Sequence, residues 1–178
     1  MNKSYLTAMH RTSRSTPAQK AYENIIAPRN FKTVLDWGCG HGADVAFFKE
    51  KKIKAVGYDQ FYSPKEPSGK YDCVMCTYVL NVLKTKMARQ ECLAKARRHL
   101  KKDGRIVISA RSLAEINKLA TTNMWNKKND GWITKAKTFQ HGFDMMELVE
   151  LAKKAGLQPI SCVNISGGVM LVAGKTGV

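Results

Sequence analysis

The sequence predicts an α/β fold, with a mostly parallel sheet, helices on both faces and an antiparallel last strand. Short apolar runs alternate with amphipathic helical segments along most of the chain, as in strands joined by crossover helices. A glycine-rich turn directly follows the first apolar run, at the position where such sheets bind ligands. Two β-prone runs flank Ser166-Gly167-Gly168 near the end of the chain, which indicates a closing hairpin.

The composition fits one globular domain. The chain has 178 residues, of which 44% are hydrophobic and 25% charged. We expect a polar, basic arm at 1–16 and a single domain at 17–178. No stretch approaches the roughly 18 apolar residues of a membrane span, and the start lacks the apolar run of a signal peptide. We therefore expect a cytoplasmic protein that does not bind membranes, with five unpatterned cysteines as free thiols and no metal site.

The charge of the chain is strongly positive. Lysine and arginine number 30 against 14 aspartate and glutamate, which gives a net charge of +16. Such a charge attracts polyanions, so nucleic acid is the first partner to expect. A basic surface without a partner is the alternative interpretation.

The first half of the predicted sheet begins after a helix. Thr16-Pro17 has the residue types of an N-cap and first turn, so we expect a helix over 17–27 that Pro28 ends. The apolar run at 31–37 predicts a buried strand, which the glycine-rich turn stops. A helix over about 42–51 follows this turn.

Two further strands are predicted at 54–59 and 71–78. Only residues 60–70 separate them, with Pro64 and Pro67 among them, which is too short and too broken for a crossover helix. We therefore expect a loop in this place.

A helix over 85–100 follows, and it leads through Asp103-Gly104 into a strand at 105–110. Its apolar residues are expected to face inward, namely Met87, Cys92, Ala96 and Leu100. Its basic residues are expected to face solvent, namely Lys86, Arg89, Lys95, Arg97 and Arg98.

The last third of the chain is predicted to end the sheet. A short helix at 112–119 leads into 121–142, which we interpret as a loop-rich insertion because tryptophans stand there among Lys, Asn and Gly. An amphipathic helix follows at 143–155. Strands at 157–164 and 169–174 form the closing antiparallel hairpin.

The turn after the first strand has the pattern of a nucleotide site. The glycines let the backbone approach a ligand at a helix N-terminus, and Asp59 ends the next strand, where a carboxylate can accept both ribose hydroxyls. Gly38-x-Gly40-x-x-Ala43 also fits a dinucleotide fingerprint. However, Asp36 would repel a pyrophosphate and would favour a cationic amine or sulfonium. The residues therefore favour S-adenosylmethionine.

The segment 34–42, Val-Leu-Asp-Trp-Gly-Cys-Gly-His-Gly, resembles the first motif of class I S-adenosylmethionine-dependent methyltransferases. Asp59 matches the acidic end of their second strand, 71–76 the fourth strand and 100–108 the turn into the fifth. The resemblance covers about 31–111. It implies a Rossmann-like sheet of order 2-1-4-5-7-6, in which this chain lacks the third strand.

A narrower resemblance concerns the methyltransferase family associated with DNA phosphorothioation. The Arg/Ser/Thr-containing arm, Tyr78-Val79-Leu80-Asn81-Val82, and the segments 131–134 and 138–140 are similar to that family. This resemblance implies a nucleic acid substrate, DNA ahead of RNA, or a modified nucleotide.

The broader resemblance implies a set of cofactor contacts. Asp36 and the following backbone would cradle the methionine part, Asp59 would hold the ribose, and Thr77 would lie near the reacting methyl group. Gln60 and Phe61 would flank the adenine. The complete cofactor set is Asp36, Gly38, Cys39, Gly40, Asp59, Gln60, Phe61 and Thr77. The missing third strand usually binds the adenine edge, which leaves Tyr71 or Asp72 as a substitute.

The chain contains neither an Asp/Asn-Pro-Pro-aromatic motif nor a cysteine after proline, so the two standard base-methylation chemistries are not expected. Positioning alone can promote methyl transfer. The catalytic candidates are Tyr78 and Asn81, with a packed aromatic residue and a helix cap as the alternative.

Substrate contacts are predicted on the arm, on 121–142 and at the C-terminal edge of the sheet. The candidates are Arg11, Arg14, Arg111 and Trp132, with solvated charges and a packing anchor as the alternative. Two other functions stay open: a non-catalytic cofactor- or nucleic-acid-binding subunit of a modification complex, and a small-molecule methyltransferase.

Overall fold

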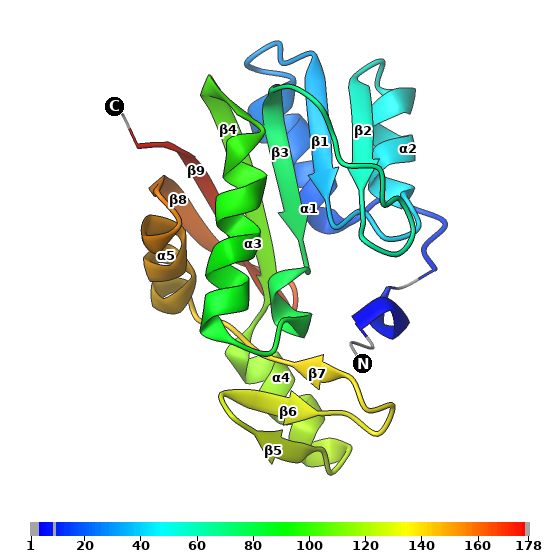
Figure 1. Ribbon diagram of the computed structural model, residues 1–178, viewed down its shortest axis with the longest axis vertical. Helices are drawn as coiled ribbons and strands as arrows, with labels where there is room; N and C mark the ends of the chain where they lie inside the picture. Colours follow the sequence, from blue (N-terminus) through cyan, green and yellow to red (C-terminus); the bar gives the residue numbers. More distant parts are fainter. Residues whose placement is uncertain (1–3, 9, 177–178) are drawn as a thin grey trace.

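The computed structural model describes residues 4–8 and 10–176, which are built around a six-stranded sheet (Figure 1). Its strands are β1 (Thr33–Trp37), β2 (Lys54–Tyr58), β3 (Tyr71–Thr77), β4 (Leu100–Arg111), β8 (Leu157–Ile165) and β9 (Gly168–Lys175). Their order is β2-β1-β3-β4-β9-β8. Strands β1 to β4 are parallel, and β9 is antiparallel to both of its neighbours. The predicted Rossmann-like order with an antiparallel last strand is confirmed.

The chain passes from β2 to β3 without an intervening strand. Residues 60–70 form a loop that starts with a backbone bridge, in which Asp59 and Ser63 each donate to the other's carbonyl oxygen at 3.0 Å. Strand β3 therefore pairs directly with β1. The prediction of a missing third strand is confirmed.

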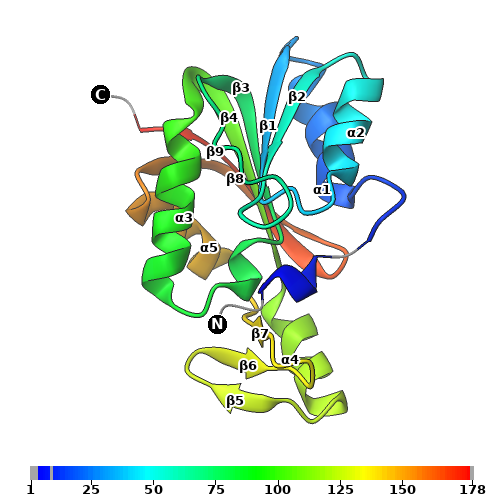
Figure 2. The same cartoon turned by 45° about the vertical axis from the view of Figure 1, so that its right-hand side comes forward.

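Helices cover both faces of the sheet (Figure 2). One face carries α3 (Lys86–Arg98) and α5 (Met145–Lys154). The other carries α1 (Thr16–Ala21), its π-helical continuation η2 (Tyr22–Ile26) and α2 (Ala43–Glu50). The predicted three-layer arrangement is therefore present.

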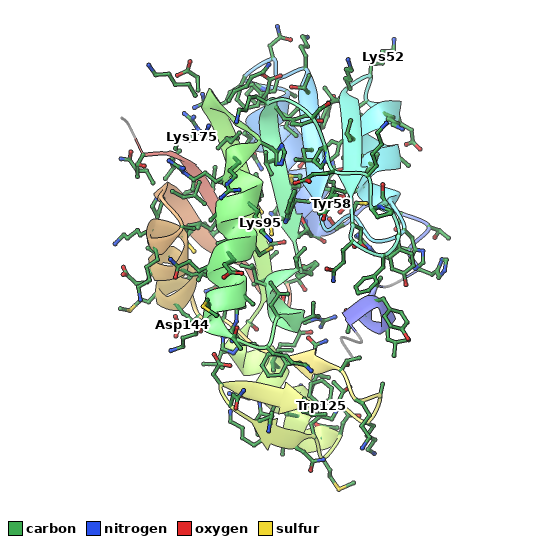
Figure 3. The ribbon with its side chains drawn as sticks, viewed as in Figure 1. Lys52, Tyr58, Lys95, Trp125, Asp144 and Lys175 are labelled. Carbon is green, nitrogen blue, oxygen red and sulfur yellow. The ribbon has the colours of Figure 1, made fainter. Side chains whose placement is uncertain are left out.

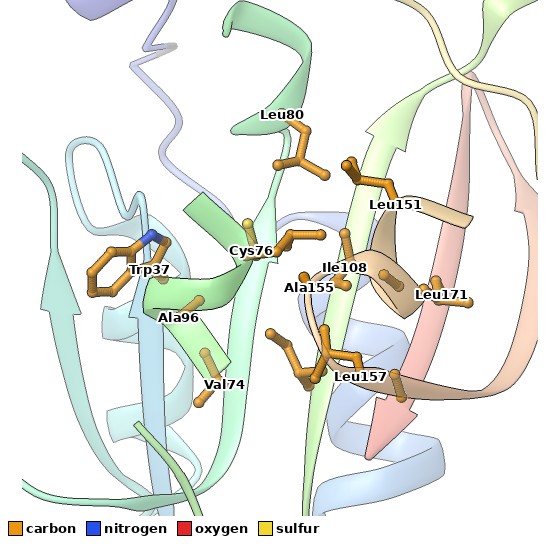
Figure 4. Close-up of a cluster of buried hydrophobic side chains, with 14 of the residues drawn as sticks. Trp37, Val74, Cys76, Leu80, Ala96, Ile108, Leu151, Ala155, Leu157 and Leu171 are labelled. Atoms are coloured by element: carbon orange, nitrogen blue, oxygen red, sulfur yellow. The ribbon is translucent and has the colours of Figure 1, made fainter. Parts of the chain in front are cut away.

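The core has two parts because neighbouring residues of a strand point to opposite faces of a sheet. Leu35 and Val74 join the buried cluster under α3 and α5, part of which is drawn in Figure 4. Val34 and Cys73, their neighbours in sequence, join the cluster under α1 and α2. Continuous apolar strands are thus explained by burial on both sides.

The start of α1 differs from the prediction by one residue. Ser15, not Thr16, is the N-cap: its backbone is extended, and its Oγ accepts a hydrogen bond from the Ala18 N–H at 3.1 Å. Pro17 lies in the first turn as expected. The helix widens to a π-helix at Tyr22 and ends before Pro28.

Two side chains of α3 face opposite to the prediction. Met87 is 69% exposed, whereas Arg89 is only 1% exposed. Arg89 is buried because carboxylates from two distant segments meet it: Asp130 lies 2.6 Å and Glu147 3.8 Å from its guanidinium nitrogens. The guanidinium also lies 5.8 Å from the ring centre of Phe143. A helical pattern assigns charged residues to solvent and contains no sign of such distant partners.

The region 121–142, for which the sequence predicts a loop-rich insertion, also contains short regular elements that the sequence does not predict. Helix α4 (Leu113–Thr122) extends into it, and a small antiparallel sheet follows. Its strands are β5 (Asn126–Lys128), β6 (Gly131–Ile133) and β7 (Phe139–Gln140). A side chain on Gly131 would come within 2.4 Å of the Phe139 ring, so the glycine permits this close packing. These strands are too short and too polar to show an alternating pattern.

Two 3-10 turns, η1 (Ser4–Thr7) and η3 (Leu80–Val82), complete the fold. All five cysteines are free, as predicted. Among the described residues, none of the helices has both the length and the apolar character that a membrane crossing requires.

Replacing Arg89 by alanine should destabilise the protein strongly, because it opens a buried space and removes the cation that Asp130 and Glu147 share. We expect the free energy of unfolding in urea to fall by about 3–5 kcal/mol. The matched change Lys86→Ala on the exposed start of α3 should stay within about 0.5 kcal/mol. Equal effects of the two changes would contradict the ion-pair assignment.

Candidate active site

A cavity of about 730 Å³ lies at the carboxyl ends of β1, β2 and β3. Tyr58, the last residue of β2, marks this edge in Figure 3. The volume of the cavity falls within the range of small-molecule and cofactor sites. The topology thus places the cavity at the edge where parallel sheets bind ligands.

The glycine-rich turn forms one wall of the cavity. Gly38, Gly40 and Gly42 have φ values of +86°, +50° and +82°, a left-handed conformation that suits glycine. A Cβ on Gly38 would come within 2.2 Å of a Val79 methyl carbon. The turn is fixed to β2, because the N–H groups of Gly38 and Cys39 donate to the Tyr58 carbonyl at 2.7 and 3.0 Å. Bare backbone is therefore presented to a ligand.

Asp59 lines the cavity directly after β2. One carboxylate oxygen accepts the Gly40 N–H at 3.2 Å, and the other accepts the N–H groups of Phe61 and Tyr62 at 2.9 and 3.2 Å. The carboxylate therefore holds the glycine turn and the following loop at the same time. Gln60 and Phe61, the predicted neighbours of the adenine, also line the cavity.

Asp36 lies beneath the glycine turn, and it is 3% exposed and does not line the cavity itself. Burial raises the pKa of Asp36 to about 8, and the carboxylates of Asp44 and Asp59 add to this shift, while Arg11 opposes it. The group is thus a buried acid that a nearby cation would ionise.

Thr77, at the end of β3, gives an independent sign of a ligand. Its buried Oγ1 has no hydrogen-bond partner among the described residues. Thr77 also lines the cavity, so a ligand there could reach this hydroxyl. A buried hydroxyl without a partner is costly, and a bound polar group would satisfy it. Together with the bare glycine backbone and Asp59, this observation shows that the site fits S-adenosylmethionine. The residues that would hold it are the predicted set, with Asp36 acting from below.

The N-terminal segment is not a detached arm. Asp44, in the first turn of α2, is 2% exposed, and its carboxylate accepts the N–H and the hydroxyl of Ser15, both at 2.7 Å. Arg11 forms an ion pair with the same carboxylate at 3.3 Å. Residues 10–15 are thereby held against the cavity. Residues 1–3 and 9 of the predicted arm lie outside the described residues.

Aromatic residues close the cavity beside Asp59. The rings of Tyr5 and Phe61 lie 5.5 Å apart, and the Tyr62 hydroxyl donates to the Tyr5 carbonyl at 2.9 Å. The rings of His10 and His41 stack at 3.7 Å. The N-terminal segment thus reaches across to the loop that follows β2.

The two catalytic candidates differ in what their side chains do. Tyr78 lines the cavity with a left-handed φ of +58°, and burial raises the pKa of its phenol, while Arg111 opposes the shift. The Asn81 amide donates to the His141 carbonyl at 2.7 Å and accepts the Arg111 N–H at 3.1 Å. Asn81 therefore joins η3, β4 and the segment after β7, an arrangement that favours a positioning role over a catalytic one.

The predicted substrate residues are only partly brought together. Arg11, Arg14 and Arg111 line the cavity. Arg111 is ion-paired with Glu115 at 2.9 Å. Trp132 does not line the cavity: its Nε1 donates to Asn117 at 3.2 Å, and Lys127 lies 4.5 Å from its ring centre.

Tyr71 and Asp72 do not substitute for the missing adenine contact. They begin β3 and so lie at the opposite end of the sheet. The Asp72 carboxylate there accepts the N–H groups of Lys32 and Thr33, both at 2.9 Å, and pairs with Lys101 at 2.8 Å. That prediction is wrong because β3, like its parallel neighbours, begins at the amino edge of the sheet, whereas the cavity lies at the carboxyl edge.

Asp130, His141 and Glu147 bring their ligand atoms within 4.8 Å of one another. The His141 Nε2 lies 2.8 Å from the Glu147 carboxylate. Arg89 is already ion-paired with both carboxylates. We therefore describe this group as a buried ion-pair network.

Sequence reasoning missed Asp44 and Glu115, which hold two of the cavity arginines. Asp44 stands just after the glycine turn, in the first helical turn, where acidic residues are common for the helix dipole alone. Glu115 lies four residues after Arg111, a spacing that indicates an ion pair only once a helix there is certain. The sequence position of each acidic residue therefore has a simpler explanation than an ion pair with a cavity arginine.

A family described as "Methyltransferase domain" matches residues 10–162. The chain belongs to this methyltransferase family. The protein is thus a methyl-transferring enzyme with S-adenosylmethionine as its cofactor, as expected. A search of curated proteins found no match.

Solved structures share the fold of this methyltransferase. That of Burkholderia thailandensis 1,6-didemethyltoxoflavin-N1-methyltransferase, with 1,6-didemethyltoxoflavin and S-adenosylhomocysteine bound, gives a TM-score of 0.72 at 20% identity, over 98% of this chain and 84% of that chain. Streptomyces venezuelae DesVI gives 0.69 at 14% identity, over 98% and 93%. An S-adenosylmethionine-dependent methyltransferase from Clostridium acetobutylicum gives 0.65 at 12% identity, over 98% and 96%. At these identities the likeness concerns the fold.

Replacing Asp59 by alanine should weaken cofactor binding, because it removes both the predicted ribose acceptor and the contact that holds Gly40. We expect the dissociation constant of S-adenosylhomocysteine, measured by calorimetry, to rise about tenfold or more. Asp103→Ala, an equal charge change on the exposed start of β4, is the control and should leave it unchanged. Unaltered affinity in the Asp59 variant would contradict the assignment.

Asp36 predicts a pH dependence of cofactor binding. With a pKa raised to about 8, the acid is mostly protonated at pH 7, and its contribution to stability is lost as the pH rises from about 4 towards 8. A cationic cofactor favours the carboxylate, so binding should release a proton and tighten between pH 6 and 8.

Calorimetry in buffers of different ionisation enthalpy measures this proton release. Asp36→Asn cannot ionise, so the variant should bind with less proton release and a flatter pH profile. The same profile in both proteins would show that another group titrates.

Proposed function

We propose that this methyltransferase transfers the methyl group to a small acceptor that carries a phosphate or carboxylate, such as a modified nucleotide. One observation supports the proposal above all: Arg11, Arg14 and Arg111 line the same cavity as the glycine turn and Asp59. An anionic acceptor would therefore meet positive charge beside the cofactor position. Bound S-adenosylmethionine supplies an electrophilic methyl carbon.

The arginines are held in place but keep donors for a ligand. Arg111 gives Nη1 to Glu115, and Arg11 lies 3.3–3.4 Å from the Asp44 carboxylate. A guanidinium has five N–H donors in a planar fork, so donors are left for a phosphate or carboxylate. A carboxylate partner also fixes each side chain, which lowers the entropy lost on binding.

Tyr78 is suited to orient the acceptor. Because burial raises its pKa, the phenol keeps its proton at neutral pH and acts as a hydrogen-bond donor, not as a base. The chain then contributes position and charge, which can supply a large part of the rate enhancement in a transfer of this kind.

DNA or RNA as the acceptor stays a prediction. The N-terminal segment walls the cavity, and Trp132 lies outside it. These two features favour a small acceptor over a base within a polymer. 1,6-Didemethyltoxoflavin, which is bound in the Burkholderia structure, is also a small molecule.

Labelled S-adenosylmethionine tests the proposal on a matched panel. The panel contains nucleoside monophosphates, the same nucleosides, small carboxylates, single-stranded DNA, duplex DNA and RNA. We expect transfer to anionic small molecules, with kcat/KM at least tenfold lower for the neutral nucleosides. Transfer to polymers alone would contradict the proposal, and cofactor binding without transfer to any member would favour a non-catalytic subunit.

Arg111→Gln should raise KM for the anionic acceptor about 10- to 100-fold, because a charge-assisted contact is lost. The dissociation constant of the cofactor should change less than twofold. Lys118→Gln, an equal charge change on the exposed face of α4, serves as the control. If KM stays the same in the Arg111 variant, this arginine does not bind the acceptor.

A further inference from the structure

The amino end of the sheet, opposite the cavity, carries a dense group of basic residues. We call it the basic ridge and define it as Arg29, Lys54, Lys70, Lys102, Arg105 and Lys175. In Figure 3, Lys52 and Lys175 are labelled toward its two sides. None of these residues lines the cavity.

The topology brings these residues together from distant parts of the sequence. Parallel strands begin at one edge, so the first residues of β2, β3 and β4 lie side by side with the end of antiparallel β9. In the register, Thr33 faces Lys54, Tyr71 faces Leu100, and Leu157 faces Lys175. The ridge is therefore a consequence of the fold and not of one charged segment.

The charges of the ridge are poorly balanced. Its six residues form no ion pair with any described carboxylate. Asp72, which lies at this end, is paired with Lys101. At the cavity, in contrast, Arg11 and Arg111 each have a carboxylate partner. Six basic residues without an ion-pair partner in the described part of the chain thus gather at the amino end of the sheet.

Mutual repulsion within the ridge is visible in two pKa values. Partial burial lowers the pKa of Arg105, and the charge of Arg29 lowers it further, while Asp103 opposes the shift. Partial burial also lowers the pKa of Lys175, and the charges of Lys70 and Arg97 add to this effect. A bound polyanion would relieve this repulsion.

We propose that the basic ridge docks nucleic acid through its phosphates, at a place separate from the methyl-transfer cavity. Strands β2, β1, β3, β4 and β9 are adjacent and span about 20 Å at roughly 4.8 Å per strand. This length corresponds to about six phosphates of one strand at 3.4 Å each. Basic residues that are spread along a line of strands suit a linear polyanion.

The ridge has few of the apolar anchors of a membrane-binding surface. Most of the large apolar side chains that are exposed among the described residues lie elsewhere, such as Met124 after α4 and Met146 on α5. Ile160 on β8 is the exception, because it packs near Gly174 beside Arg105, and a single aliphatic side chain offers little area for insertion. Stable membrane binding usually needs apolar insertion in addition to charge. Nucleic acid is therefore favoured over an anionic bilayer.

Docking at the ridge keeps the polymer away from the reacting methyl group. From Arg105 to Arg111, strand β4 runs for about 20 Å at roughly 3.3 Å per residue, and Arg111 is at the cavity. The ridge would therefore locate the enzyme on nucleic acid without presenting a base to the cavity.

Two triple variants of equal charge test this inference. Lys54→Gln/Lys70→Gln/Lys102→Gln changes the ridge, and Lys118→Gln/Lys128→Gln/Lys135→Gln changes α4 and the β5–β7 sheet; all six lysines are exposed. Binding of a labelled 20-base-pair duplex and of a 20-nucleotide RNA is measured by fluorescence anisotropy between 50 and 300 mM NaCl.

We expect the ridge variant to bind at least tenfold more weakly, with a log–log salt slope about 2 to 3 units shallower. The other variant should change affinity less than twofold. Both variants should keep the wild-type melting temperature and cofactor affinity, which shows that the fold and the cavity are intact.

Three results would overturn the inference. Equal weakening in both variants would show that only net charge matters. A larger loss in the β5–β7 variant would move the interface to the cavity side. Unchanged nucleic acid binding, with loss of binding to vesicles containing 30% phosphatidylserine, would identify an anionic membrane as the partner. None of these results depends on methyl transfer.

Discussion

The left-handed backbone after β1 is the constraint on which the site depends. Gly38 must lack a side chain, because Val79 packs where a Cβ would stand. This contact brings the end of β3 against the turn, and the hydrogen bonds to Tyr58 bring the end of β2 against it from the other side. Three strand ends therefore converge on one short segment of backbone, and the cavity forms between them.

The strand order was predictable from the sequence because apolar runs, a glycine turn and a broken linker are local signals. The predicted cofactor contacts rest on the same signals and on the family resemblance, and all of these residues except Asp36 line the cavity. The errors arose where distant segments decide the outcome. Arg89 is buried because Asp130 and Glu147 meet it, and β5–β7 are held by backbone pairing that polar side chains do not reveal.

The contrast between local signals and contacts of distant segments also applies to the net charge of the chain. Net charge is a property of composition, and it indicates polyanion binding without locating the surface. The fold places basic residues in two different settings: carboxylates hold Arg11 and Arg111 at the cavity, whereas the six residues of the basic ridge have no ion-pair partner among the described residues. A basic protein can thus have a cavity whose charges are balanced by carboxylates and, elsewhere on the same fold, a surface whose charges are not.

The missing third strand leaves β2 at the border of the sheet. Such a strand exposes unpaired N–H and C=O groups, on which another chain can add a strand and start aggregation. Here β2 is only five residues long, starts with the exposed Lys54 and ends in the backbone bridge between Asp59 and Ser63. Asp59, the predicted ribose contact, thus also stands where pairing along β2 ends, so the loop that replaces the third strand protects this edge of the sheet from self-association.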